Sequence, residues 1–338
     1  MSDDLNLPTL DDVAKRAGVS TATVSRALNR SGKVSDETRE RVMQAVDLLG
    51  YTPHFGARAM AAKRTTTIGA IIPTMENAIF ARGIQAFQEK LHALGYTLLV
   101  ASNAYQPELE AEQIRALVAR GADGLLLIGY ERDEAIYEYL DKRGVPTLIA
   151  WSFSKQIQRP AIGFDNRASM RALADKVLSM GHRHVGIISG IVQGNDRAAG
   201  RLGGIQDALR AHGLDPSAAP MVETPYEIEN GARAFETLMQ NNPRPTVVMC
   251  ANDVLAVGAL QQARAMNIDV PGDVSVTGFD DIELARITTP SITTVHVPHR
   301  RMGDRAATEL IEMVERKSAG ASIELESNLI MRGSLRAL

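Results

Sequence analysis

The chain has 338 residues, of which 45% are hydrophobic and 23% are charged, a composition typical of a globular protein with two or three domains. No apolar run reaches the roughly 18 residues that a membrane-spanning helix needs. The acidic start Met1-Ser2-Asp3-Asp4 lacks the basic and apolar regions of a signal peptide. The single cysteine, Cys250, excludes an internal disulfide framework and a zinc site built from cysteines. We therefore expect a cytoplasmic protein with no membrane partner.

The charge is distributed unevenly along the chain. Residues 1–64 carry ten Lys or Arg and eight Asp or Glu, a net charge of +2, whereas the remainder carries −5. A mildly basic head on an acidic body indicates that only the head meets a polyanion.

Three short helices are predicted in residues 8–52, and each begins at a residue type that caps helices. The predicted ranges are 10–17, 20–28 and 35–49, with Thr9, Ser20 and Ser35 as the N-cap residues. Gly18 supplies a permissive turn between the first two helices. Two helices joined by a tight turn and braced by a third predict a helix-turn-helix DNA-binding domain. A small helical bundle with a solvated polar face is the alternative.

The second predicted helix is the one expected to enter the major groove of DNA. Its exposed side carries Thr21, Ala22, Ser25 and Arg26, with Asn29 just beyond. An arginine can pair with guanine edges, and small Thr and Ala side chains can meet thymine methyl groups.

The segment from Leu10 to Asn29, continued by Val34-Ser35-Asp36-Glu37-Thr38-Arg39 and Leu49-Gly50-Tyr51-Thr52-Pro53, resembles the DNA-binding head of LacI/GalR-family transcription regulators. The resemblance extends through nearly the whole chain. It implies that Thr21, Ala22 and Arg26 read base edges. It also implies that Thr9, Ser20, Ser25 and Asn29 hold phosphates or helix ends, and Leu10 and Ser35 complete the predicted DNA-binding set of the head.

Residues 53–64 form a short, Ala-rich stretch that starts with Pro53. An isolated helix of this length is marginal in water, so it needs a partner to form. The resemblance implies a hinge helix that folds on DNA, pairs with its dimer mate and wedges Met60 into the minor groove. His54 and Ala57 are the other DNA contacts predicted in this segment, and an unstructured tether is the alternative.

From Thr66 onward, short apolar runs alternate with amphipathic helical segments, which predicts an α/β fold with parallel sheets. The runs expected to form buried strands are 68–72, 97–101, 124–128, 147–150, 185–189, 247–250 and 274–278. The order repeats in two halves, joined by crossover strands near residues 162–164, 292–296 and 325–330. The resemblance implies a periplasmic-binding-protein-like body with two lobes. We expect the first lobe to comprise residues 65–163 plus 297–324, and the second residues 164–292 plus 325–338.

Ligands of open α/β lobes bind at the carboxyl ends of the strands. The residues predicted to bind an effector there are Asn77, Phe80, Tyr130 and Trp151 in the first lobe, and Arg197, Arg201, Asn252 and Asp280 in the second. The resemblance implies that Arg201 clamps hydroxyls or carboxylates, and the planar fork of arginine suits paired oxygens. Arginines that face Asp and Asn favour a small polar effector such as a sugar, polyol or sugar acid.

Two of these assignments have structural alternatives. Trp151, the only tryptophan, either stacks on a sugar face or packs at the lobe junction. Asp253, which follows Asn252, either faces the ligand or caps the next helix.

Catalytic motifs find little support. His182 and His184 have the spacing of a metal pair, but no further Cys or His cluster completes a site, and a structural joint is favoured. The glycine-rich stretch 200–204 lacks the Lys-Ser/Thr of a phosphate-binding loop, and Ser189-Gly190 lacks a hydrolase elbow. We predict no metal, no cofactor and no enzyme activity. A sugar- or nucleotide-handling α/β enzyme is the alternative class.

The prediction is a sequence-specific transcription regulator, with a repressor favoured, whose affinity for double-stranded operator DNA is controlled by the effector. One helical head reads only half a site, so we expect a homodimer on a near-palindromic operator. The last residues, 332–338, contain no heptad extension that could form a tetramerising coiled coil.

Overall fold

The computed structural model describes residues 7–28, 34–52, 64–76 and 78–338. These residues belong to two compact units, one ending at Thr65 and the other beginning at Thr66. Asn29, Asn77 and the predicted hinge contacts His54, Ala57 and Met60 lie outside the described residues.

The first unit contains the three predicted helices, α1 (Leu10–Ala17), α2 (Thr21–Leu28) and α3 (Asp36–Leu49). Their apolar faces meet in a small core in which Val13, Val24 and Val42 are fully buried. Gly18 and Gly50 adopt left-handed backbone angles after α1 and α3, where glycine is favoured because it has no Cβ. The predicted helix-turn-helix arrangement is confirmed.

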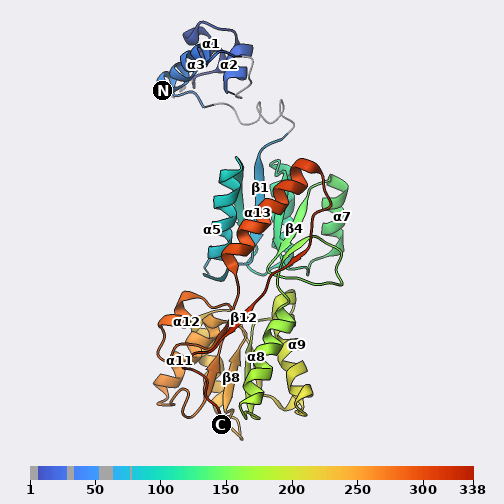
Figure 1. The fold of residues 1–338 in the computed structure, drawn as a ribbon, viewed down its shortest axis with the longest axis vertical. Coiled ribbons are helices and arrows are strands. Elements are labelled where there is room, and N and C mark those ends of the chain that lie inside the picture. Colours follow the sequence, from blue (N-terminus) through green and yellow to red (C-terminus); the bar gives the residue numbers. More distant parts are fainter. Residues whose placement is uncertain (1–6, 29–33, 53–63, 77) are drawn as a thin grey trace, which may run out of the picture. The chain divides into compact units, whose positions relative to one another are not determined.

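The first lobe of the second unit is a six-stranded parallel sheet with the order β11-β5-β4-β3-β1-β2. Its strands are β1 (Thr67–Ile72), β2 (Thr97–Ser102), β3 (Gly124–Ile128), β4 (Thr147–Ala150), β5 (Ala161–Gly163) and β11 (Ile323–Glu324). Helices α5 (Ala78–Ala93) and α13 (His299–Arg316) cover one face, and α6 (Pro107–Ala119) and α7 (Glu134–Arg143) cover the other. Figure 1 shows α13 beside α5, although the two helices are far apart in the sequence.

The second lobe is a four-stranded parallel sheet with the order β7-β6-β8-β9. Its strands are β6 (Val185–Ser189), β7 (Met221–Glu223), β8 (Val247–Cys250) and β9 (Ser275–Thr277). Helices α8 (Asn166–Ser179) and α9 (Asp196–Ala211) pack on one face, and α10 (Ile228–Met239) and α11 (Asp253–Ala265) on the other. The short elements η1 (Pro216–Ala218) and α12 (Glu283–Ile287) complete the lobe.

The chain passes between the lobes at three places, close to the predicted crossover strands. It leaves the first lobe after β5, returns through β10 (Thr294–His296) and leaves again through β12 (Asn328–Ile330). Strands β10 and β12 pair antiparallel, and β12 is visible between the lobes in Figure 1. The two-lobed α/β fold is confirmed.

The prediction that the strand at 97–101 is buried is wrong. The run 97–101 forms β2, but β2 lies at the edge of its sheet and its residues are exposed or half-buried. An edge strand has a neighbour on one side only, so an apolar run does not ensure burial there. None of the helices that the structure describes is long and apolar enough to cross a membrane.

Candidate functional site

Each helix of the first unit is capped by the residue that the sequence predicts. The Thr9 hydroxyl accepts from the Asp12 backbone N–H, and the Thr9 backbone N–H donates to Asp12 Oδ2 at 2.9 Å, which forms a capping box. Ser20 accepts from the Thr23 N–H, and Ser35 accepts from the Thr38 N–H. Local capping thus occupies all three hydroxyls, and their first role is to fix where the helices begin.

The predicted reading face of α2 is open to solvent. Thr21, Ala22 and Arg26 are exposed and Ser25 is half-buried, while Val24 and Ala27 turn into the core. Because the exposed residues share one side of the helix, they are free to meet a partner together. Leu10 is half-buried at the start of α1, where it packs against the core of the unit.

In the second unit, a cavity of about 20 Å³ lies where strand ends of both lobes meet. Its lining residues are Ile79, Phe80, Tyr105, Trp151, Phe164, Asn195, Arg197, Arg201, Tyr226 and Asp280. Five of these side chains are aromatic, and the polar ones come from the second lobe and its connection to the first. We call this space the inner cavity. It has room for about one water molecule.

Arg201 is the central cation of the inner cavity and is almost fully buried. Its Nη1 donates to Asn166 Oδ1 at 2.9 Å and its Nη2 donates to the Tyr226 hydroxyl at 2.8 Å. Its guanidinium also lies 5.1 Å from the ring centre of Phe279. Its Nε is buried and has no hydrogen-bond partner among the described residues. Asn166 also donates to the Trp151 carbonyl, so it fixes Arg201 relative to the first lobe.

Asp280 is the counterpart of Arg201. It is 2% exposed, and its Oδ2 has no hydrogen-bond partner among the described residues. Burial raises the pKa of Asp280 to about 7, against the opposing positive charge of Arg201. Arg201 and Asp280 both line the inner cavity, and each has one buried polar atom that is unpaired among the described residues, which is costly to leave unsatisfied.

Phe80 and Trp151 form an apolar wall. Trp151 is 2% exposed, packs edge-on against Phe80 and donates its indole N–H to His299 Nδ1 at 3.2 Å. Trp151 therefore has the packing role that one of its two alternatives predicts, and it also lines the inner cavity.

Arg197 lines the inner cavity, but its side chain already donates hydrogen bonds to other groups of the protein. Its Nη1 donates to the Ile128 carbonyl of the first lobe at 3.1 Å and to Asp196 at 2.9 Å. Asp196 in turn accepts from the Tyr130 backbone N–H and from the Ser152 hydroxyl. These bonds join the lobes beside the cavity, so Asp196 and Arg197 link the lobes as well as lining the cleft.

Two predicted effector contacts lie elsewhere. The Tyr130 ring packs in the core between the sheet and α6 and α7, because the direction of the chain after β3 turns it away from the cleft. Asn252 caps α11 by accepting from the Leu255 N–H, and it does not line the inner cavity. Neither alternative for Asp253 is found: it is fully buried, accepts from the Thr294 hydroxyl and the Ile282 N–H, and does not line the inner cavity, while Asn252 supplies the cap.

Five further residues line the inner cavity that the sequence did not single out: Ile79, Tyr105, Phe164, Asn195 and Tyr226. Tyr105 comes three residues after β2, so the strand-end rule could have found it. Tyr226 comes three residues after β7, and β7 is too short and too polar to stand out as a strand. Phe164 comes directly after β5, so the same rule could have found it, whereas Asn195 is the N-cap of α9 and carries no separate signal.

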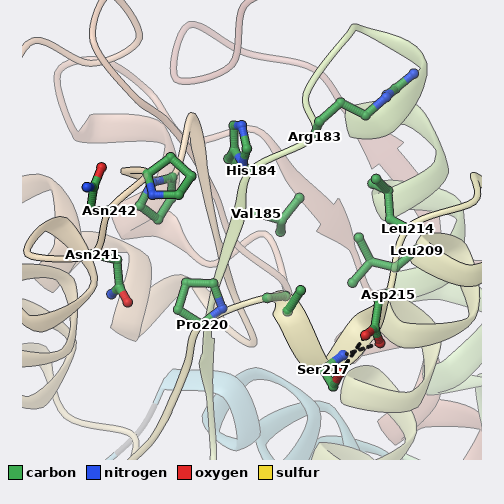
Figure 2. Close-up of a pocket in the computed structure, with 14 residues that line it drawn as sticks. Arg183, His184, Val185, Leu209, Leu214, Asp215, Ser217, Pro220, Asn241 and Asn242 are labelled. Atoms are coloured by element: carbon green, nitrogen blue, oxygen red, sulfur yellow. Dashed lines mark hydrogen bonds between the residues drawn. The ribbon is translucent and has the colours of Figure 1, made fainter.

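A larger cavity of about 470 Å³ lies in the second lobe, near the amino ends of its strands (Figure 2). Prolines, alanines and leucines make up half of its lining, and most of the other half is polar or charged. The Asp215 carboxylate in it is satisfied by the backbone and hydroxyl of Ser217, shown by dashed lines in Figure 2. Nearby His182 is buried, with its ring nitrogens on the Thr246 hydroxyl and the Arg336 carbonyl. This pairing gives His182 a structural role at the joint before β6.

The comparisons with known proteins agree with this geometry. Residues 9–54 match the family described as bacterial regulatory proteins, lacI family, and residues 174–335 match the periplasmic binding protein-like domain. The HTH-type transcriptional repressor PurR of Erwinia tasmaniensis is 34% identical over 333 residues, which is 97% of each chain. The chain belongs to the LacI family. It is a DNA-binding transcriptional repressor of that family.

Solved LacI-family structures share the whole architecture. A LacI-family regulator from Silicibacter pomeroyi is 26% identical, with a TM-score of 0.89 over 97% of this chain and 99% of that one. The lac repressor dimer bound to operator and an anti-inducer is 26% identical, with a TM-score of 0.86 over 98% of this chain and 99% of that one. These relatives are transcription regulators, not enzymes.

Proposed function

We propose that this repressor binds a near-palindromic operator as a homodimer, with one head on each half-site. The open face of α2 supports the assignment of Thr21, Ala22 and Arg26 to base edges. Thr9, Ser20, Ser25 and Asn29 would hold phosphates or helix ends, and Leu10 and Ser35 complete the proposed DNA contacts of the head. The lac repressor dimer on its operator supports the twofold arrangement.

The proposed division of labour has four parts. Residues 8–52 read DNA, and residues 53–64 form the hinge, with Met60 as the wedge in the minor groove and His54 and Ala57 as further DNA contacts. Residues 65–163 plus 297–324, and 164–292 plus 325–338, form the two lobes. The two sheets of the second unit and the three crossings between them support the lobe boundaries. We expect the protein to act in the cytoplasm, where its operator lies.

We also propose that a small polyhydroxylated effector, such as a sugar, polyol or sugar acid, binds between the lobes. One observation carries this proposal: Arg201 and Asp280, each of which has a buried polar atom without a partner among the described residues, line an aromatic-walled cavity. A hydroxyl group can accept from an arginine and donate to a carboxylate, so hydroxyls satisfy both atoms. The flat apolar side of a sugar ring suits Phe80 and Trp151.

The effector would act by changing how the lobes are held together. Contacts of Asp196 and Arg197 with the first lobe lie beside the inner cavity, so a ligand there competes with or reinforces them. In the dimer, movement of the first lobes of the two protomers relative to each other would separate the paired hinge segments and release the operator. Binding of DNA and of effector are then reciprocally linked.

The DNA half of this proposal is tested by selecting bound sequences from a random double-stranded pool. We expect the natural chain to enrich a near-palindromic sequence. Arg26→Ala should lose that enrichment while keeping effector affinity, and Arg41→Ala, which removes an exposed head arginine outside α2, should keep both. Equal losses in both activities for Arg26→Ala would contradict a separate reading head.

The effector half is tested by thermal stabilisation with sugars, polyols, sugar acids and purines, since aromatic walls also suit a flat heterocycle. We expect a hydroxylated compound to raise the melting temperature. Arg201→Ala should abolish the shift, whereas Arg210→Ala, an exposed position on the same helix, should keep it. Stabilisation by a purine alone would refute the polyhydroxylated class.

A further inference from the structure

One carboxylate at the start of α9, in the second lobe, bonds to two groups of the first lobe. Asp196 Oδ2 accepts from the Tyr130 backbone N–H at 3.0 Å and from the Ser152 hydroxyl at 2.9 Å. Its Oδ1 accepts from Arg197 Nη1 at 2.9 Å, and the same nitrogen donates to the Ile128 carbonyl of the first lobe at 3.1 Å. We call Asp196 and Arg197, together with these three partners in the first lobe, the latch.

Gly129 makes room for the latch at the end of β3. Its φ of 71° lies in the left-handed region, and a Cβ built on it would lie 1.9 Å from Arg197 Nη1 and 2.2 Å from Asp196 Oδ1. Only a residue without a side chain lets the second lobe approach the backbone of the first this closely. The backbone of the first lobe is thus fitted to these two side chains of the second.

The latch is shielded from water. The side chains of Asp196 and Arg197 are 21% and 9% exposed, and hydrogen bonds to ionised groups are stronger where water is excluded. A further ion pair between the lobes joins Arg82 of α5 to Glu283 of α12, but these side chains are 37% and 77% exposed, so water screens their attraction. Of these two contacts, the latch therefore contributes more to holding the lobes together.

The inner cavity lies beside the latch and is closed while the latch is formed. Arg197 is one of its walls, and the latch partner Ser152 directly follows Trp151, which is another. At about 20 Å³ the cavity holds about one water molecule. A larger molecule needs its walls to separate, and separation of the lobes at this point breaks the bonds of Asp196 to Tyr130 and Ser152.

We infer that the latch is an autoinhibitory contact that keeps the lobes closed when no effector is bound. Molecules with a closed latch do not admit an effector, so the apparent affinity for any effector falls in proportion to the fraction of molecules in which the latch is open. The latch thereby sets how much effector the repressor needs before it responds. This consequence rests on the proposed function of the cleft, whereas the latch itself is tested without an effector.

The test measures quenching of tryptophan fluorescence by acrylamide in the purified full-length chain. Trp151 is the only tryptophan, is 2% exposed and lines the inner cavity, so its quenching reports opening there. We expect weak quenching of the natural chain. Asp196→Ala should raise the bimolecular quenching constant, obtained from the Stern–Volmer slope and the fluorescence lifetime, at least twofold. Gly129→Ala should also raise it, because the new Cβ displaces the same two side chains from the first-lobe side.

Each variant has a matched control. Asp207→Ala removes another carboxylate of α9, one that pairs with Arg167 inside the second lobe. Gly144→Ala places a Cβ on another left-handed glycine of the first lobe, with φ 63°, where it would meet no atom within 4 Å. Both controls should leave the quenching constant unchanged, and circular dichroism verifies the fold of all four variants.

Equal quenching of Asp196→Ala and Asp207→Ala would overturn the inference, because the latch would then not hold the lobes closed. A natural chain quenched as strongly as Asp196→Ala would also overturn it, because the lobes would already be open. If Asp196→Ala does not fold, the two glycine variants decide, and equal quenching of Gly129→Ala and Gly144→Ala refutes the latch. No arm of this test contains effector or DNA, so the inference can fail while the proposed function stands.

Discussion

Asp280 and Asp281 are adjacent carboxylates with opposite electrostatic environments. Burial raises the pKa of Asp280 to about 7. Burial would also raise the pKa of Asp281, but hydrogen bonds from Arg286, Arg332 and His296 outweigh it and lower that pKa. Asp280 is therefore available to the cleft, whereas Asp281 bonds to β10 through His296 and to the C-terminal segment through Arg332.

The Asp280 environment predicts a dependence of stability on pH. The folded pKa lies above the ordinary value of 3.8, so the folded state binds this proton more tightly than the unfolded state. The stability that Asp280 contributes to the folded state is fully present below about pH 4 and is lost as the pH rises through 7. We expect the free energy of unfolding in urea to fall between pH 5 and 8, and Asp280→Asn to flatten that fall.

Asp281→Asn is the contrasting variant. Its lowered pKa gives stability that is present above the ordinary value and lost only as pH falls below it. This variant should therefore be less stable throughout pH 5–8 without a change in slope. An Asp280→Asn curve parallel to that of the natural chain would show that Asp280 does not titrate in this range.

At the scale of elements, the first lobe depends on the close crossing of α5 and α13. A Cβ on Gly303 would lie 2.0 Å from the Gly83 carbonyl oxygen, and one on Gly83 would lie 2.4 Å from the Trp151 ring. Two glycines at one crossing let the helix backbones touch. That contact places Phe80 and Trp151 at the cavity wall.

Gly303→Ala should therefore force the two helices apart. We expect it to lower the free energy of unfolding by about 1–3 kcal/mol or more, through overpacking, and to weaken effector binding. Gly203→Ala is the control: it is also helical, and its Cβ would meet the Arg167 side chain at an ordinary 3.4 Å. That variant should gain up to about 1 kcal/mol from helix propensity. Equal urea midpoints for the two variants would contradict a backbone contact.

At the scale of the whole molecule, the last residues of the chain complete the second lobe. The Ser334 hydroxyl donates to the Val276 carbonyl at 2.6 Å and accepts from the Thr293 N–H at 2.8 Å. The Val276 N–H donates to the Ser334 carbonyl, and the Leu338 N–H donates to the Met180 carbonyl. The C-terminal segment thus covers the edge strand β9.

Ser334→Ala leaves two buried backbone groups without this partner and should cost about 1–3 kcal/mol. Because the head and the body are separate compact units, calorimetry of the full chain should show the loss in the body transition only. Ser217→Ala, at an exposed position of the same lobe, should shift neither transition by a comparable amount. A matching shift of the head transition would contradict independent units.

Much of the fold could be predicted from the sequence because its signals are local. Thr9, Ser20 and Ser35 each accept a hydrogen bond from a backbone N–H three residues away, so a short window contains both partners. The apolar runs 124–128, 147–150, 185–189 and 247–250 coincide with β3, β4, β6 and β8, since strands buried on both faces must be continuously apolar.

Which side chains line the cleft depends on the tertiary structure. The sequence placed Phe80, Trp151, Arg197, Arg201 and Asp280 at strand ends or on the helices that follow, and all five line the inner cavity. It did not exclude Tyr130 and Asn252, because a position after a strand does not fix the direction of a side chain. It also missed Tyr105 and Tyr226, whose rings meet only because two lobes separated by many residues close on each other. Hydrogen bonds within one turn are determined by sequence spacing, whereas contacts across a cleft depend on how whole lobes pack.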